Sequence, residues 1–223
     1  GLLYAGSRLA PGSAGGLYRL NANGSTTKIV AGDRPAGVLV DAADGDIFIS
    51  EDYGGAMYRS AFGATTRSTW VSGFSSGDDD PVGMAIAPTG YTGPILSAGQ
   101  ALVVDRGANG TSDYIWRWSP AAAEGEVLVH SDSASAGPMV DVVDVAISSS
   151  AIYLVDTKET ANGVIYRLDA GPTFTPIATQ SPIADPYGIE IDPTTGDLLV
   201  LDGAPDRLLR VNPATGAVTE IFA

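Results

Sequence analysis

The sequence contains no cysteine, which excludes disulfide bonds, thiolate nucleophiles and cysteine-ligated zinc. It has one histidine, His130, and only two lysines. No apolar run approaches the roughly 18 residues of a membrane-spanning helix. The motifs of a GxSxG nucleophile elbow, a phosphate-binding P-loop and a Rossmann dinucleotide site are also missing. The absence of these residues and motifs disfavours the classes of enzyme that depend on them.

Positive charge is scarce in this chain. The net charge of −14 argues against nucleic acid as a partner, because phosphate backbones need a basic surface, and against adsorption to anionic lipid. The acidic residues comprise twenty Asp and six Glu. Asp favours turns and helix caps, so the first interpretation of the excess of Asp over Glu is a structural role in turns. Cation binding by carboxylate oxygens is the alternative.

Five segments repeat one pattern, in which a strand-like stretch ends in a bulky residue followed by arginine. The arginines are 40 to 58 residues apart. A period of roughly 40–50 residues with four short strands per unit is typical of a β-propeller. The five copies are Leu17-Tyr18-Arg19, Met57-Tyr58-Arg59, Ile115-Trp116-Arg117, Ile165-Tyr166-Arg167 and Leu208-Leu209-Arg210.

Each repeat also has an earlier apolar strand and, before that, a strand that opens with Pro-x-Gly or a variant of it. The segment 185–188 (Asp-Pro-Tyr-Gly) shows the motif, and 141–144 (Asp-Val-Val-Asp) is the variant. We therefore predict an all-β propeller of about five four-stranded blades, with strands A to D running outward from the axis. Strand B ends in a carboxylate in four of the five copies: Glu51, Asp105, Asp156 and Asp202.

The chain is expected to form a single propeller domain over residues 1–223. The first blade has strands B, C and D but no innermost strand A. We therefore expect the native chain to continue past one terminus, and the alternative is an unusual open or three-stranded blade. Three stretches exceed the basic repeat, namely 91–100, 106–113 and 157–162. Function on repeat scaffolds tends to reside in such insertions, which rigid sheets hold in place.

The repeat resembles the propeller families of NHL repeats and of the SMP-30/gluconolactonase group. The pattern is Pro-x-Gly with alternating apolar residues and Asp, then an apolar strand ending in Asp, then an arginine-bearing strand. Residues 185–211 match it best. The segment 34–59 also looks like a blade of bacterial sugar dehydrogenases that use pyrroloquinoline quinone. The resemblance is one of repeat pattern, so it implies the fold more strongly than the function.

The starts of the A strands predict a metal site. In a propeller these residues cluster at the mouth of the axial channel, and carboxylates from separate blades repel one another unless a cation is bound. The SMP-30-like group holds one divalent metal in this way, which implies a calcium-like ion and lactone hydrolysis. That family's Glu-Gly-Pro opening is missing here. The predicted ligands are Asp80, Asp141, Asp144 and Asp185, with Asp78 and Asp79 beside them.

Each of these groups also has a structural interpretation. An Asp before a Pro caps a turn, and the carboxylates that end the B strands are expected to accept backbone hydrogen bonds from their B–C turns. The recurring arginines are expected to bridge neighbouring turns or pair with a carboxylate of their own blade. The segment 41–46 superficially resembles a calcium loop but is interpreted as a hairpin turn.

Two further residues are predicted to bind a ligand: Tyr187 and Arg34, which lie at starts of A strands. His130 is placed at the end of an outer strand, far from the axis. A Ser-His-Asp triad, a His-based lactonase and a quinone dehydrogenase with a His base would each need a histidine near the axis, so all three are disfavoured.

Two functions therefore remain open. One is a non-catalytic propeller that binds a protein, glycan or small molecule at one face. The other is a Ca²⁺-dependent hydrolase of lactones or related esters, and quinone-dependent sugar oxidation is a distant third. Acidity, the few lysines and the resemblance favour an extracellular or periplasmic bacterial protein.

Overall fold

A computed structural model describes most of the chain and contains only strands in the described part. The described residues are 3–7, 15–31, 35–51, 56–72, 80–106, 112–119, 127–133, 138–139, 141–157, 162–178, 183–204 and 206–222. Among them, no helix has the length and apolar character that a membrane span requires. The chain divides into two compact units, Gly1–Gly83 and Met84–Ala223, which are taken separately below.

The first unit holds two antiparallel sheets whose strands follow sequence order. One sheet has three strands, so among the described residues the first repeat does lack an A strand, as predicted. Strands β1 and β4 of the two sheets contact each other. The strands are β1 (Leu3–Ser7), β2 (Gly16–Leu20) and β3 (Thr26–Ala31), then β4 (Pro35–Val40), β5 (Ile47–Glu51), β6 (Ala56–Ser60) and β7 (Ser68–Ser72).

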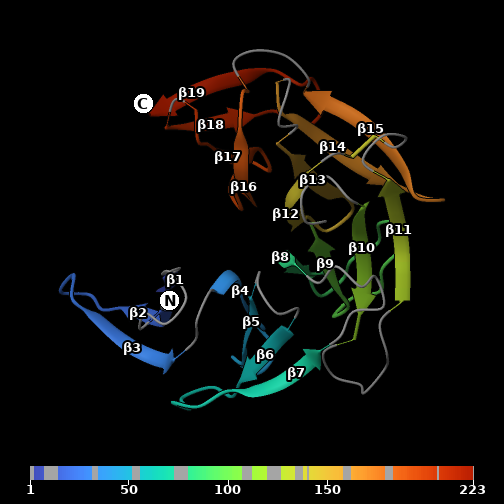
Figure 1. Cartoon of the computed structure of the whole chain (residues 1–223). Helices are drawn as coiled ribbons and strands as arrows, with labels where there is room; N and C mark the ends of the chain where they lie inside the picture. Colours follow the sequence, from blue (N-terminus) through green and yellow to red (C-terminus); the bar gives the residue numbers. More distant parts are fainter. Residues whose placement is uncertain are drawn as a thin grey trace. The chain divides into compact units, whose positions relative to one another are not determined.

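The second unit holds three four-stranded antiparallel sheets, and its boundary falls within β8 (Figure 1). Strand β12 contacts β16, the first strand of the next sheet, and β9, the second strand of the preceding sheet. The strands are β8 (Pro81–Ile86), β9 (Ala101–Asp105), β10 (Ser112–Trp118) and β11 (Val127–Ser133); β12 (Val142–Ile147), β13 (Ile152–Asp156), β14 (Val164–Asp169) and β15 (Thr173–Ala178); β16 (Pro186–Ile191), β17 (Leu198–Asp202), β18 (Arg207–Val211) and β19 (Val218–Phe222).

These sheets are the blades of a β-propeller. Each is a meander of up to four strands, and a single blade exposes two apolar faces that only stacking on neighbours can bury. The all-β propeller, with five sheets of which the first is incomplete, confirms the predicted fold class. One domain over 1–223 stays a prediction.

The bulky-Arg repeat marks a β-bulge that recurs in every sheet. Pairing between the last two strands of each sheet shifts by one residue directly before Tyr18, Tyr58, Trp116, Tyr166 and Leu209. The extra residue lies on the last strand and is bulky and apolar in all five sheets. A bulge bends its strand and increases its twist. The extra residues are Ile29, Trp70, Val129, Ile177 and Ile221.

The repeated arginines bind the turns of their own blades, as predicted. Arg59 contacts Asp46 and Asp44 of the β4–β5 turn, and Arg210 contacts Asp192 and Asp197 of the β16–β17 turn. Hydrogen bonds also join Arg19 to Asn21, Arg117 to the Ile95 carbonyl and Arg167 to Asp169.

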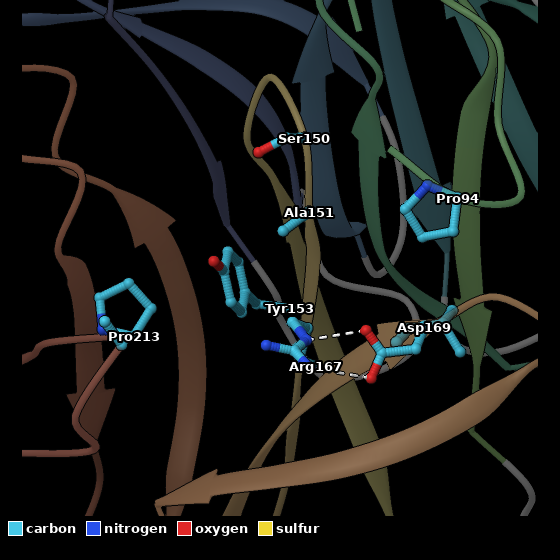
Figure 2. Close-up of a pocket in the computed structure, with 9 residues that line it drawn as sticks. Pro94, Ser150, Ala151, Tyr153, Arg167, Asp169 and Pro213 are labelled. Carbon is cyan, nitrogen blue, oxygen red and sulfur yellow. Dashed lines mark hydrogen bonds and ion pairs between the residues drawn. The ribbon is translucent and has the colours of Figure 1, made fainter. Parts of the chain in front are cut away.

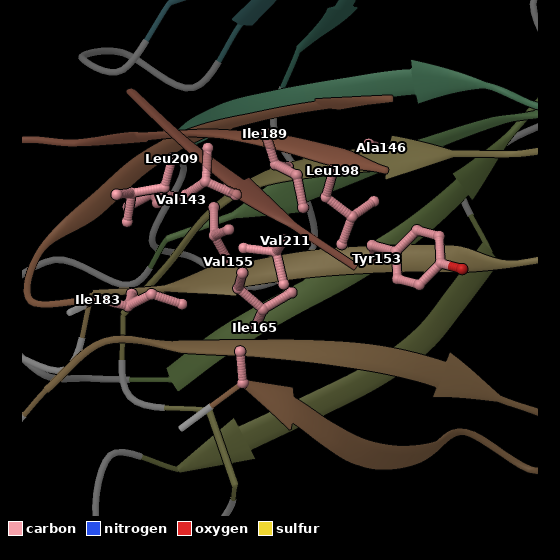
Figure 3. Close-up of a cluster of buried hydrophobic side chains, with 12 residues drawn as sticks. Val143, Ala146, Tyr153, Val155, Ile165, Ile183, Ile189, Leu198, Leu209 and Val211 are labelled. Carbon is pink, nitrogen blue, oxygen red and sulfur yellow. The ribbon is translucent and has the colours of Figure 1, made fainter. Parts of the chain in front are cut away.

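The core of the second unit lies between the sheets β12–β15 and β16–β19 (Figure 3). Ile165, Val200 and Leu209 are fully buried there. Along β17, Leu198 and Val200 point into this core, whereas Leu201, on the other face of the strand, is largely exposed. This packing fixes the loops that join the strands at both ends of the sheets.

Candidate functional site

Several carboxylates that were predicted as metal ligands lie at one end of the second unit. Asp141 lies just before β12, and its buried carboxylate is held from two sides. Arg106, the residue after β9, contacts one oxygen at 2.7 Å, and the Thr157 hydroxyl donates to the other at 2.6 Å. The predicted ligand Asp141 therefore has internal partners for both oxygens.

Asp185 and Asp202 occupy the equivalent place in the next sheet. The buried Asp202 carboxylate accepts from the backbone N–H groups of Ala184 and Asp185 and contacts the Arg207 guanidinium at 2.6 Å. Burial, followed by the charges of Asp202 and Asp141, raises the pKa of Asp185. Asp185 is thus close enough to Asp202 and Asp141 to be repelled by both.

Asp144 joins two neighbouring sheets. Its Oδ2 accepts the backbone N–H of Ile189 in β16 at 3.0 Å, and its Oδ1 accepts the N–H of Val145 at 2.9 Å. Burial raises the pKa of the Asp144 carboxyl to about 7, although both hydrogen bonds act in the opposite direction. Asp144 therefore changes charge near neutral pH.

The titration of Asp144 predicts a pH-dependent stability. Because the pKa is raised in the folded protein, the folded state binds more protons than the unfolded state between pH 4 and 7. This contribution is complete below about pH 4 and is lost as the pH rises through about 7. The unfolding free energy of the wild type should therefore fall by up to about 4 kcal/mol across that range as Asp144 ionises, and this fall should be absent in Asp144→Asn.

Urea denaturation of the wild type and the variant at half-unit pH steps measures this difference. Asp192→Asn is a control of opposite sign, because hydrogen bonds from Thr194 and Arg210 lower the pKa of Asp192. Parallel pH profiles for the wild type and Asp144→Asn would show that Asp144 does not titrate as described.

The structure describes little of the surroundings of the remaining predicted ligands. Asp80 lies directly before β8 and is partly buried, whereas Asp78, Asp79 and Arg34 fall outside the described residues. Within the described part of the chain, no three carboxylates or histidines gather in an arrangement that could hold a metal ion. Cation binding by Asp80, Asp141, Asp144 and Asp185 stays a prediction.

The carboxylates at the ends of the second strands are buried, as a structural role requires. The turns that were expected to supply donors to Glu51, Asp105 and Asp156 lie largely outside the described residues, so that part stays a prediction. The backbone donors to Asp156 and Asp202 are residues just before the first strand of the same sheet, Asp141 for the former and Ala184 and Asp185 for the latter. Glu51 pairs with Arg67. These carboxylates therefore fix the chain where it enters each blade.

Tyr187 is the extra residue of a bulge between β16 and β17. Its side chain is 56% exposed and lies in a shallow groove of about 250 Å³ with Leu201, Arg207 and Phe222. The bulge turns Tyr187 onto the face of the last sheet. Its role as a ligand-binding residue stays a prediction.

A second hollow lies at the opposite end of the same sheets, where the β12–β13, β14–β15 and β18–β19 turns meet (Figure 2). It measures about 420 Å³, within the usual range for small-ligand pockets. Figure 2 shows Tyr153 and Arg167 between Pro213 on one side and Pro94 on the other. Of these four residues, Arg167 was noted in the sequence as a repeated arginine and Pro94 lies in the insertion 91–100, whereas Tyr153 and Pro213 were not singled out.

One wall of this pocket is the insertion 91–100, where the sequence did predict function. The Tyr91 hydroxyl donates to the Pro94 carbonyl at 2.9 Å, and the Thr92 N–H donates to the Ser149 carbonyl at 2.9 Å. Ile95 has a positive φ of 71°, which is rare for a β-branched residue and is found mainly where the surroundings enforce it. The wall is therefore held in one conformation.

The polar groups of the pocket are a phenol and an ion pair. Tyr153 is only 8% exposed, and its hydroxyl makes no hydrogen bond to any described residue. Arg167 binds Asp169 through Nε at 2.8 Å and Nη2 at 3.2 Å. Its third nitrogen points away from Asp169 toward Pro213 (Figure 2). The hollow is thus lined by donor groups that have no partner among the described residues.

His130 lies in β11, the outermost strand of its sheet, and its ring packs against Phe174 at 4.6 Å. This confirms the outer-strand position predicted from the sequence. The lone histidine does not lie at either of the two places described above.

The chain is similar to solved propellers in structure but not in sequence. No protein-family profile and no curated protein matches it. A chain of a nidogen–laminin complex has a TM-score of 0.69 and 15% identity over 93% of this chain and 70% of its own. A gluconolactonase from Xanthomonas campestris has a TM-score of 0.66 and 16% identity over 92% and 68%.

Virginiamycin B lyase from Staphylococcus aureus has a TM-score of 0.58 and 14% identity, and the match covers all of this chain and 74% of the lyase. At these identities the likeness shows the fold alone. The chain is therefore a β-propeller with gluconolactonase-like structural neighbours.

Proposed function

We propose that this chain is a binding propeller without metal-dependent catalysis. The proposal rests on the hydrogen bonds and ion pairs that the carboxylates of the predicted metal ligands already make within the protein. Asp141 is held by Arg106 and Thr157, and both oxygens of Asp144 accept backbone N–H groups. A cation would have to displace these partners, at the cost of leaving buried donors unsatisfied.

Calcium binding tests the proposal directly. We expect protein purified without chelator to contain no stoichiometric divalent ion, and millimolar Ca²⁺ to leave its melting temperature unchanged. A site of micromolar affinity would instead add about 4 kcal/mol of stability under these conditions. Elemental analysis and thermal melts measure both quantities.

Variants make the calcium test specific. A stabilisation by Ca²⁺ that disappears in Asp185→Asn but persists in Asp206→Asn would overturn the proposal. Asp206 is exposed and lies near the same end of the last sheet, so it reports non-specific binding of cations to the acidic surface.

The second candidate is a Ca²⁺-dependent lactone or ester hydrolase. It is supported by the repulsion of Asp185 by Asp202 and Asp141 and by the gluconolactonases among the structural neighbours. In this case the ion would neutralise that repulsion and polarise the substrate carbonyl. Hydrolysis of an aldonolactone that requires Ca²⁺ would favour it over the binding propeller.

The proposed partner is a protein, glycan or small molecule bound at one face, and the proposed location is extracellular or periplasmic. The nidogen–laminin complex among the neighbours supports partner binding by such a fold. The net charge of −14 supports a partner other than nucleic acid.

A further inference from the structure

The pocket beside Arg167 offers polar groups that the protein itself does not use. Tyr153 lines the pocket, and its hydroxyl makes no hydrogen bond to any described residue, so it can bond to a ligand. Burial raises the pKa of the Tyr153 hydroxyl, so it stays protonated at neutral pH and can donate. The free nitrogen of Arg167 adds two N–H donors on the same side of the pocket (Figure 2).

The charge of the pocket favours a neutral ligand. Arg167 and Asp169 form a bidentate pair, so their charges cancel locally. An anionic ligand would be attracted by the guanidinium but repelled by Asp169 and by the net charge of −14. A cationic ligand would be attracted by Asp169 but repelled by the guanidinium of Arg167. Neither charged class matches the arrangement as well as a neutral one.

Donors and acceptors alternate over a short distance in this pocket. The guanidinium donates, the Asp169 oxygens accept, and the Tyr153 hydroxyl can do both. Adjacent hydroxyl groups on a sugar have the same property, because each donates one hydrogen bond and accepts others. Rigid apolar side chains of Pro94 and Pro213 flank these groups and match the C–H faces of a sugar ring.

We propose that this pocket binds a neutral, hydroxyl-rich small molecule of the size of a mono- or disaccharide, with Tyr153, Arg167 and Asp169 as its polar contacts. This inference assigns a site and a ligand class to the proposed binding function and rests on it. The fixed insertion 91–100 means that little conformational entropy is lost when the ligand binds.

Isothermal titration of the full chain with glucose, galactose, mannose, maltose and cellobiose tests the proposal, with D-glucuronate and D-glucosamine as charged comparators. We expect at least one neutral sugar to bind more tightly than both charged ones. Tyr153→Phe should weaken that binding about 2–10-fold and Arg167→Lys about 10–100-fold. Tyr153→Phe should not lower stability, since the lost hydroxyl has no partner in the protein.

The matched control is Arg59→Lys. Arg59 occupies the same position in another repeat and forms a similar pair with Asp46, but it does not line the pocket. Sugar binding should therefore be unchanged in Arg59→Lys. The proposal is overturned if no neutral sugar in the panel binds, if a charged comparator binds more tightly, or if the two pocket variants bind as the wild type does.

The calcium assay on the same preparation separates this inference from the proposed function. A stoichiometric ion whose binding depends on Asp185 would contradict the proposal that the propeller has no metal-dependent catalysis. It would leave the proposed sugar binding at the opposite end of the sheets unaffected. Absence of both the ion and sugar binding would overturn the pocket assignment alone.

Discussion

Asp202→Ala is expected to lower the free energy of unfolding by about 3–5 kcal/mol. Asp202 is 1% exposed and satisfies three donors at once: the N–H groups of Ala184 and Asp185 and the guanidinium of Arg207. Removing the carboxylate leaves two backbone groups without a partner and a largely buried cation. Urea denaturation followed by circular dichroism measures the loss.

Two further variants define the cause of this loss. Asp206→Ala removes the same charge from an exposed position in the same blade and should change stability by less than about 0.5 kcal/mol. Asp202→Asn keeps the shape and one acceptor, so its loss should be intermediate. Equal stability of Asp202→Ala and Asp206→Ala would show that the hydrogen bonds of Asp202 do not fix the start of β16.

Gly163→Ala is expected to destabilise the protein by about 3 kcal/mol. A Cβ atom at Gly163 would lie 2.0 Å from Cδ and 2.6 Å from Cγ of Pro186. The proline ring cannot move aside, because it opens β16 and its backbone is fixed by neighbouring hydrogen bonds. Two adjacent sheets would therefore have to separate locally, which thermal and urea denaturation would detect.

Gly188→Ala is the matched control for this close approach. Its new Cβ would meet Leu201 Cδ1 at 3.4 Å, an ordinary contact, and it lies in the same strand as Pro186. Because alanine restricts the unfolded chain, stability should stay the same or rise by up to about 1 kcal/mol. A Gly163→Ala protein as stable as Gly188→Ala would contradict the close packing of β14 against β16.

Local patterns in the sequence were sufficient to predict the blades. Strand β13 (Ile152–Asp156), for example, ends in the carboxylate that the sequence placed at the end of this strand. Alternation of apolar residues and turn residues carries this information, because a strand with one or two buried faces has a period of two. The turn-binding role of Arg59 and Arg210 also followed from their regular spacing.

The fourth strands were the weakest part of the prediction for a physical reason. Each contains an extra bulky apolar residue, such as Trp70 or Ile177, at a bulge. A bulge breaks the alternation on which recognition of a strand depends. Comparing the five fourth strands at a fixed distance from the arginine would have revealed this second repeat.

The partners of the carboxylates could not be predicted from local patterns. Arg106 and Asp141 belong to successive sheets, and their contact depends on how the sheets stack. The pocket likewise combines the turn residue Ser150, the turn residue Pro213 and the insertion residue Pro94 from three sheets. Only the insertion left a signal in the sequence, as a departure from the length of the basic repeat.

The electrostatics of the two ends of the second unit differ in a way that supports separate roles. At one end, Asp141 and Asp202 are each held by an arginine and by further donors, so their function is to secure the chain. At the other end, Arg167 keeps free donor capacity beside an unpartnered hydroxyl of Tyr153. Binding is therefore expected where the polar groups are unsatisfied.

A crystal structure of the chain grown with several millimolar CaCl₂ tests the central claim most directly, because anomalous scattering reveals the ion. The account predicts that Asp141 contacts Arg106 and Thr157, that Asp144 accepts the Ile189 N–H, and that no Ca²⁺ lies between them. A Ca²⁺ ion coordinated by Asp141, Asp144 or Asp185, with Arg106 displaced, would contradict it.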